Sequence, residues 1–201
     1  LKDNETKALL AILESGDEPG INMAEKLHEI GYLLERTNNH SDAERLIALL
    51  CDIRQRSGHT STKQMLETMD LLTYINGRQG KLSESLNAHF SIYLKCLGAD
   101  HRMFFLASSL NNLGFSFKQN KHFEEAKLCF IQALDIVTQM ELGLDKLPRF
   151  LEDLAFFWGD QKCFDQSELT FRELVDVNNQ INATSQRQAR SLTDLAFVLI
   201  Q

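Results

Sequence analysis

The sequence predicts an all-α protein, an α-solenoid in which antiparallel helix pairs stack into a superhelix. Three observations favour this fold. The 201 residues include only 2 Pro and 10 Gly, so few residues would interrupt helices. Five similar apolar segments recur at intervals of 41 or 42 residues. In four of them a small residue is followed, 12 positions later, by a second one. A near-constant stride of this length indicates a repeat architecture.

The five segments share one pattern. Their first, fourth and sixth residues are apolar and the fifth is small, which is the spacing of one helix face. The sixth residue is aromatic in every segment. We expect each segment to lie in the first helix of a pair, helix A. The segments are residues 27–34, 69–76, 110–117, 151–158 and 192–199.

A second helix, helix B, is expected after each of the first four segments. Short polar turns at 37–39, 77–80, 119–121 and 160–162 separate the two helical patterns. Small side chains on both helices allow the backbones to approach, so we expect A and B to cross at these residues. The small residues pair as Gly31 with Ala43, Thr73 with Ser85, Gly114 with Ala126, and Ala155 with Ser167.

The spacing divides the chain, residues 1–201, into units of a single solenoid. The first residue is Leu1 and the last apolar helical pattern runs to Gln201, so we interpret the chain as a piece of a longer protein. The units are helix B of a preceding or capping unit at 1–19, repeats at 20–62, 63–102, 103–145 and 146–183, and helix A of an incomplete repeat at 184–201.

This pattern resembles the tetratricopeptide repeat (TPR). The longer stride is similar to that of the repeats in kinesin light chains, and residues 97–101 (LGADH) with 110–114 (LNNLG) reproduce their motif. HEAT-type helix pairs share a period of 40–47 residues and are the rival, but the constant small-to-small spacing favours the TPR type. The residues that fit the TPR consensus are Leu110, Leu113, Gly114, Phe117, Phe123, Ala126, Phe130 and Ala133.

The resemblance implies that the A helices line a concave groove that binds a peptide or helix of another protein. We expect Asn111 and Asn112 near its middle, since a carboxamide both donates and accepts hydrogen bonds and can hold a peptide main chain. Acidic residues in the row would favour a partner with basic and apolar side chains. The candidate groove residues are Glu29, Tyr32, Asp70, Tyr74, Asn111, Asn112, Phe115, Lys118, Glu152, Asp153, Phe156, Asp194 and Phe197.

Other interpretations of the same residues stay open. The aromatic residues could pack between neighbouring A helices, the acidic row could be an ordinary solvated face, and the Asn pair could form a hydrogen bond between stacked helices. A clamp for a partner's carboxylate, built from Lys118, Arg149 and Arg190, ranks below a site for a basic peptide, because these bases do not cluster in sequence.

Composition and motifs argue against most other functions. A net charge of −7 does not favour binding to nucleic acid. No catalytic, phosphate-loop, metal or cofactor motif is present, and the four cysteines are far apart. No apolar stretch is long enough to insert into a membrane. We therefore expect a cytoplasmic, non-enzymatic interaction scaffold without cofactors. The alternative is a peptide-sensing or regulatory module of a larger regulator or signalling enzyme.

Overall fold

The computed structural model describes residues 21–57, 62–97, 102–140 and 142–201. Within these residues the chain forms α-helices and one short 3-10 helix, without any strand. The prediction of an all-α solenoid is therefore confirmed. The helix expected at 1–19 and most of the 97–101 motif lie outside the described residues, and the division into units at the stated boundaries stays a prediction.

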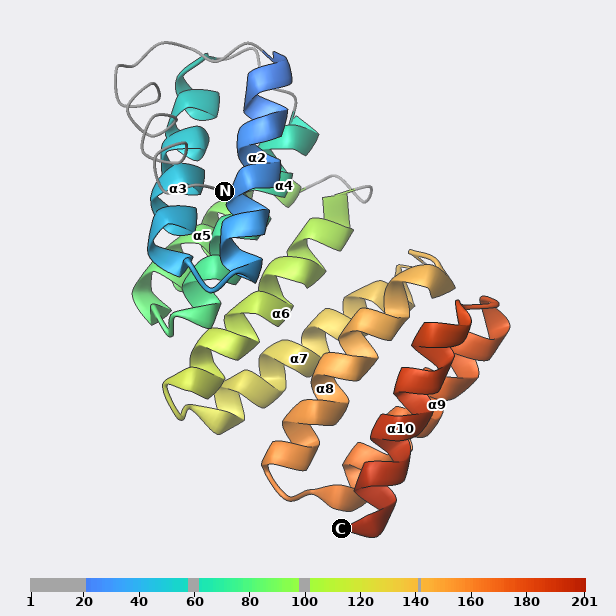
Figure 1. Ribbon diagram of the computed structural model, residues 1–201. Helices are drawn as coiled ribbons and strands as arrows, with labels where there is room; N and C mark the ends of the chain where they lie inside the picture. Colours follow the sequence, from blue (N-terminus) through green and yellow to red (C-terminus); the bar gives the residue numbers. More distant parts are fainter. Residues whose placement is uncertain (1–20, 58–61, 98–101, 141) are drawn as a thin grey trace.

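Helices of type A and type B alternate along the chain, and Figure 1 shows the hairpins following one another from α2 to α10. Each of the five aligned segments lies within an A helix. The A helices are α2 (Ile21–Arg36), α4 (Thr62–Arg78), α6 (Met103–Gln119), α8 (Leu147–Asp160) and α10 (Ser185–Ile200); the B helices are α3 (His40–Ser57), α5 (Leu82–Cys96), α7 (Phe123–Gln139) and α9 (Phe164–Gln180); the 3-10 helix is η2 (Leu144–Lys146).

Helices A and B of each hairpin meet at the paired small residues. Ala126, Ala155 and Ser167 are fully buried. The Ser167 hydroxyl donates a hydrogen bond of 2.9 Å to the Ala155 carbonyl oxygen, which lies 12 positions earlier. A Cβ atom on Gly114 would lie 3.0 Å from the Phe130 ring. These contacts leave no room for larger side chains at the crossing.

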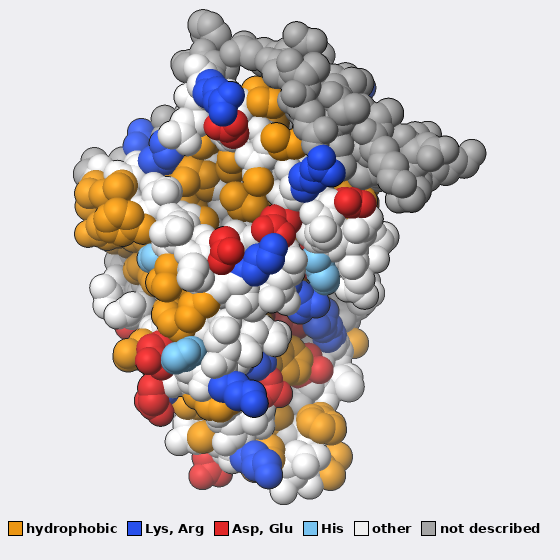
Figure 2. Space-filling view, turned by 90° about the vertical axis from the view of Figure 1, so that its left-hand side faces the viewer, with side chains coloured by type: hydrophobic (Ala, Val, Ile, Leu, Met, Phe, Trp, Pro, Cys, Tyr) orange, Lys and Arg blue, Asp and Glu red, His pale blue; other side chains and the backbone are white. Residues whose placement is uncertain are grey.

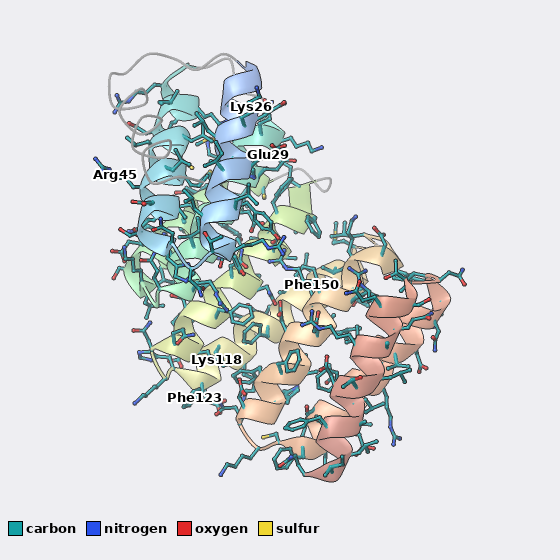
Figure 3. All side chains as sticks on the ribbon, viewed as in Figure 1. Lys26, Glu29, Arg45, Lys118, Phe123 and Phe150 are labelled. Atoms are coloured by element: carbon teal, nitrogen blue, oxygen red, sulfur yellow. The ribbon has the colours of Figure 1, made fainter. Side chains whose placement is uncertain are left out.

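The hydrophobic core is completed only by stacking. Four of its clusters each combine one hairpin with the A helix that follows it. Phe150 of α8, labelled in Figure 3, is fully buried against residues of α6 and α7. Its ring meets that of Phe104 edge to face, with the centroids 6.2 Å apart. A hairpin alone would thus leave an apolar face in water, as expected for a repeat protein.

Four of the A helices, α2, α4, α6 and α8, end in a recurring turn. Asn38, Gly80, Lys121 and Lys162 each have a positive φ between 59° and 67°. The amide of the next residue bonds back to the carbonyl five positions earlier, as Cys163 does to Trp158 at 2.9 Å. This is the Schellman arrangement, in which the left-handed position favours glycine. The polar turns predicted from sequence are therefore helix C-caps.

We expect Ala126→Leu to lower the free energy of unfolding by about 1–3 kcal/mol, because the added atoms overpack the crossing. Chemical denaturation measures the change. Leu128→Ala on the same helix is the control. Because Leu128 is half exposed, this substitution should change the free energy of unfolding by less than about 1 kcal/mol. Equal effects at the two positions would contradict the close crossing.

We expect Lys162→Gly to raise the free energy of unfolding by up to about 1 kcal/mol, because glycine removes the steric cost of the left-handed conformation. Gly80→Ala should lower it by a similar amount. Lys127→Gly, within helix α7, is the control and should destabilise by about 1 kcal/mol. If Lys162→Gly behaves like Lys127→Gly, the cap assignment is wrong.

Candidate functional site

A cavity of about 940 Å³ runs along the A helices, and we call it the A-helix cavity. Each of the five A helices contributes to it, among them α2 through Tyr32 and α10 through Arg190. Of the residues predicted for the groove, eight line the cavity: Tyr32, Asp70, Tyr74, Asn112, Phe115, Glu152, Asp153 and Phe156.

The aromatic row is only partly covered by packing. The Phe115 ring meets Phe130 of the B helix edge to face at 5.2 Å, and Phe156 meets Phe171 in the same way at the same distance. Nevertheless Phe156 is 40% exposed and Tyr32 is 49% exposed. Phe115 and Phe156 therefore rest against their own hairpins, and both of them line the cavity together with Tyr32.

A closed hydrogen-bond network joins α4, α6 and α8 at the cavity. Ser108 and Asn112 of α6 donate to the two carboxylate oxygens of Asp70, at 2.8 Å and 3.0 Å. Arg149 of α8 donates to the Ser108 hydroxyl at 3.1 Å and to the side-chain oxygen Oδ1 of Asn112 at 3.0 Å. The carboxylate and the guanidinium are thus bridged by two neutral side chains rather than paired directly.

Asn111 lies behind the cavity rather than on its surface. Its amide donates to Asp153 Oδ2 at 2.7 Å, its side chain is fully buried, and its Oδ1 atom has no hydrogen-bond partner among the described residues. Asn112 lines the cavity, but its amide is bonded to Asp70. The Asn pair therefore links neighbouring A helices, which is the alternative role left open by the sequence.

Burial raises the pKa of Asp70 to about 6, although Arg149 and the hydrogen bonds from Ser108 and Asn112 oppose the shift. Burial also raises the pKa of Asp153 to about 6, against the hydrogen bond from Asn111. A carboxylate withdrawn from water loses hydration, and hydrogen bonds recover only part of that loss. Both groups are mostly ionised at pH 7 and both titrate just below it.

The charges around the cavity are mixed. Glu152 forms an ion pair with Arg190 at 2.9 Å, so this acid is already partnered within the protein. The expected acidic row is therefore interrupted by cations. The basic residues in the lining are Lys63, Arg78, Lys146, Arg149 and Arg190, and the acidic ones are Glu67, Asp70, Glu152 and Asp153.

The remaining predicted residues lie away from the cavity. Glu29 lines a smaller hollow that also includes Tyr32. Lys118 forms an ion pair with Asp160 at the ends of α6 and α8. Asp194 lies 3.9 Å from Arg190, and Phe197 is an exposed ring of α10.

The sequence pattern missed Ser108, Phe104 and Phe105 as parts of the site, and it gave Arg149 only as part of the lower-ranked carboxylate clamp. Ser108 and Arg149 share one register, two positions before the aligned segments, so the repeat alignment could have found them. Phe104 and Phe105 line the cavity from the first turn of α6, ahead of the segments that were aligned.

The described residues contain no group of side chains suited to a metal ion. The four cysteines are free, and burial raises the pKa of the Cys51 thiol to about 12. No described helix has the length and hydrophobicity needed to cross a membrane. On the face shown in Figure 2, basic and acidic side chains are interspersed among polar and hydrophobic ones.

We expect Asp70 and Asp153 to make the fold more stable as the pH falls from 7.5 to 5. Their folded-state pKa of about 6 exceeds the value of about 3.9 for unfolded Asp, so the folded chain binds more protons in this interval. The gain is about 1 kcal/mol for each carboxylate. Urea denaturation at each pH measures it.

The matched variant is Asp70→Asn with Asp153→Asn, which lacks both carboxylates. The quantity to compare is the change in the free energy of unfolding between pH 7.5 and pH 5, in the original chain and in this variant. The variant is needed because burial lowers the pKa of His28 and of His89, so these two groups make the fold less stable as the pH falls. The same pH response in both proteins would show that the two carboxylates do not titrate in this range.

Solved structures share this fold. BtubC (BKLC) from P. vanneervenii aligns with a TM-score of 0.68 and 13% identity, over 97% of this chain and 80% of BtubC. The apo form of RapI aligns with a TM-score of 0.61 and 15% identity, over 84% of this chain and 60% of RapI. No protein-family model and no curated protein matches the sequence. The chain thus has the TPR-type helical-repeat fold that its sequence resembles.

Proposed function

We propose that this chain is a protein-interaction scaffold that binds a peptide or helix of another protein in the A-helix cavity. One observation carries the proposal: aromatic side chains at one repeat position, from four successive A helices, line a single continuous cavity. Aromatic rings supply large contact areas at a small cost in conformational entropy, because they have few rotatable bonds.

The cavity is preorganised for such a ligand. Phe115 and Phe156 are held by rings of their own hairpins, and the network from Asp70 to Arg149 fixes three A helices relative to one another. A scaffold that is already ordered loses little entropy on binding. Little of the binding free energy of a partner segment is then needed to order the groove.

The lining suggests the character of the partner segment. The rings would contact apolar side chains, and the interspersed cations and anions would contact charges of both signs. Glu152 forms an ion pair with Arg190, and the carboxylates of Asp70 and Asp153 accept hydrogen bonds within the protein. Few acidic groups therefore remain to bind a purely basic peptide. We therefore propose an amphipathic segment with mixed charge as the ligand.

The test is selection of a displayed library of random peptides on the immobilised chain. Selected peptides should lose about tenfold or more in affinity when Tyr32→Ala and Phe156→Leu are combined, because both rings line the cavity. Fluorescence anisotropy with the synthesised peptides measures the change.

Phe90→Ala is the control. Phe90 is an aromatic residue of α5 that is 60% exposed and does not line the cavity, so its loss should leave the affinity unchanged. Peptides that bind the double variant as tightly as the original chain, or that lose affinity only with Phe90→Ala, would overturn the proposed site.

A further inference from the structure

A second cavity, of about 510 Å³, lies between α8, α9 and α10, and we call it the α8–α10 pocket. Its volume is in the range of small-molecule sites. Three arginines line this pocket. Arg149 comes from α8, whereas Arg187 and Arg190 come from α10, about one repeat later in the sequence. The lining residues are Asp145, Pro148, Arg149, Glu152, Leu174, Asn178, Thr184, Gln186, Arg187, Arg190 and Ser191.

Asn178 of α9 gives the pocket an unsatisfied polar group. The residue is 1% exposed, and neither the Nδ2 nor the Oδ1 atom of its side chain has a hydrogen-bond partner among the described residues. A buried carboxamide without partners is costly to the fold. The group can donate two hydrogen bonds and accept two more, so a polar ligand in the pocket would offset this cost.

Not all arginines of the pocket form an ion pair with a carboxylate of the described residues. Glu152 is paired with Arg190 at 2.9 Å, and Asp145 with Lys146 at 2.7 Å. The two acids of the pocket thus each have a cationic partner. Among the described residues, Arg149 donates hydrogen bonds to the neutral side chains of Ser108 and Asn112, and its charge acts on Asp70 and Asp153 without a direct ion pair.

Arg187 is exposed, and its side chain forms no ion pair within the part of the chain that the structure describes. Together with Arg149, it leaves the pocket with two guanidinium groups that have no carboxylate in direct contact. This charge suits a dianion better than a monoanion, because one carboxylate would match only one of the two.

From these contacts we infer that the α8–α10 pocket binds a phosphate monoester. Such a group carries a charge of about −1.5 to −2 at pH 7, and guanidinium groups hold phosphate oxygens through paired hydrogen bonds. Arg149 and Arg187 would hold the phosphate, while Asn178 would bond to it or to the polar atoms next to it. The phosphate could belong to a free small molecule or to a phosphorylated side chain of a partner protein.

The inference does not depend on the proposed function. The α8–α10 pocket shares Arg149, Glu152 and Arg190 with the A-helix cavity, but Asn178 and Arg187 belong to the pocket alone. The carboxylate clamp considered from sequence ranked low because its bases are dispersed along the chain. Folding brings two of them, Arg149 and Arg190, to one pocket.

The experiment is calorimetric titration of the full chain with phenyl phosphate, and with benzoate at the same ionic strength. Phenyl phosphate should bind saturably and benzoate at least about tenfold more weakly, because it carries one charge fewer. Arg187→Gln and Asn178→Ala should each weaken phenyl phosphate binding by about tenfold or more. Arg172→Gln on α9 is the control, because Arg172 pairs with Glu168 outside the pocket, and it should bind normally.

Arg187→Gln decides the result if Asn178→Ala fails to fold, because Arg187 lies on the surface. A serine phosphopeptide that binds more tightly than phosphoserine itself would place the phosphate on a protein partner, and equal affinities would favour a small molecule; both support the site. No saturable binding of phenyl phosphate, equal binding of benzoate, or unchanged binding in Arg187→Gln would each overturn it.

Discussion

The close approach of helices A and B at paired small residues is the constraint on which the rest of the structure depends. Gly114 lies against the Phe130 ring, and Ser167 bonds to the backbone of Ala155. Because each hairpin is held in nearly the same way, the next A helix meets it with the same apolar surface. The regular stack follows from that repetition, and the cavity along the A helices follows from the stack.

A constant stride also explains why the sequence predicted so much. Residues one period apart occupy equivalent places on successive A helices, so an aromatic residue at the sixth place of each segment predicts a row of rings. Tyr32, Tyr74, Phe115 and Phe156 do line one cavity. The alternation of helices, their turns and the crossing residues could be predicted for the same reason, since local spacing specifies them.

The partners of polar side chains could not be predicted in this way. Asn111 and Asn112 are adjacent in sequence, yet one bonds forward to Asp153 of α8 and the other back to Asp70 of α4. Which neighbour each side chain reaches depends on the rotation between hairpins, and the spacing does not encode it. The α8–α10 pocket could not be predicted from the sequence either, because its arginines come from α8 and α10, which belong to separate repeats.

The network at the cavity has a consequence for the stiffness of the stack. One carboxylate, two neutral side chains and one guanidinium tie α4, α6 and α8 into a closed loop of hydrogen bonds. Bending the superhelix at this level would stretch charge-assisted bonds, which are stronger than neutral ones. We therefore expect α4, α6 and α8 to move as one unit, and changes in the pitch of the superhelix to occur at the hairpins on either side of them.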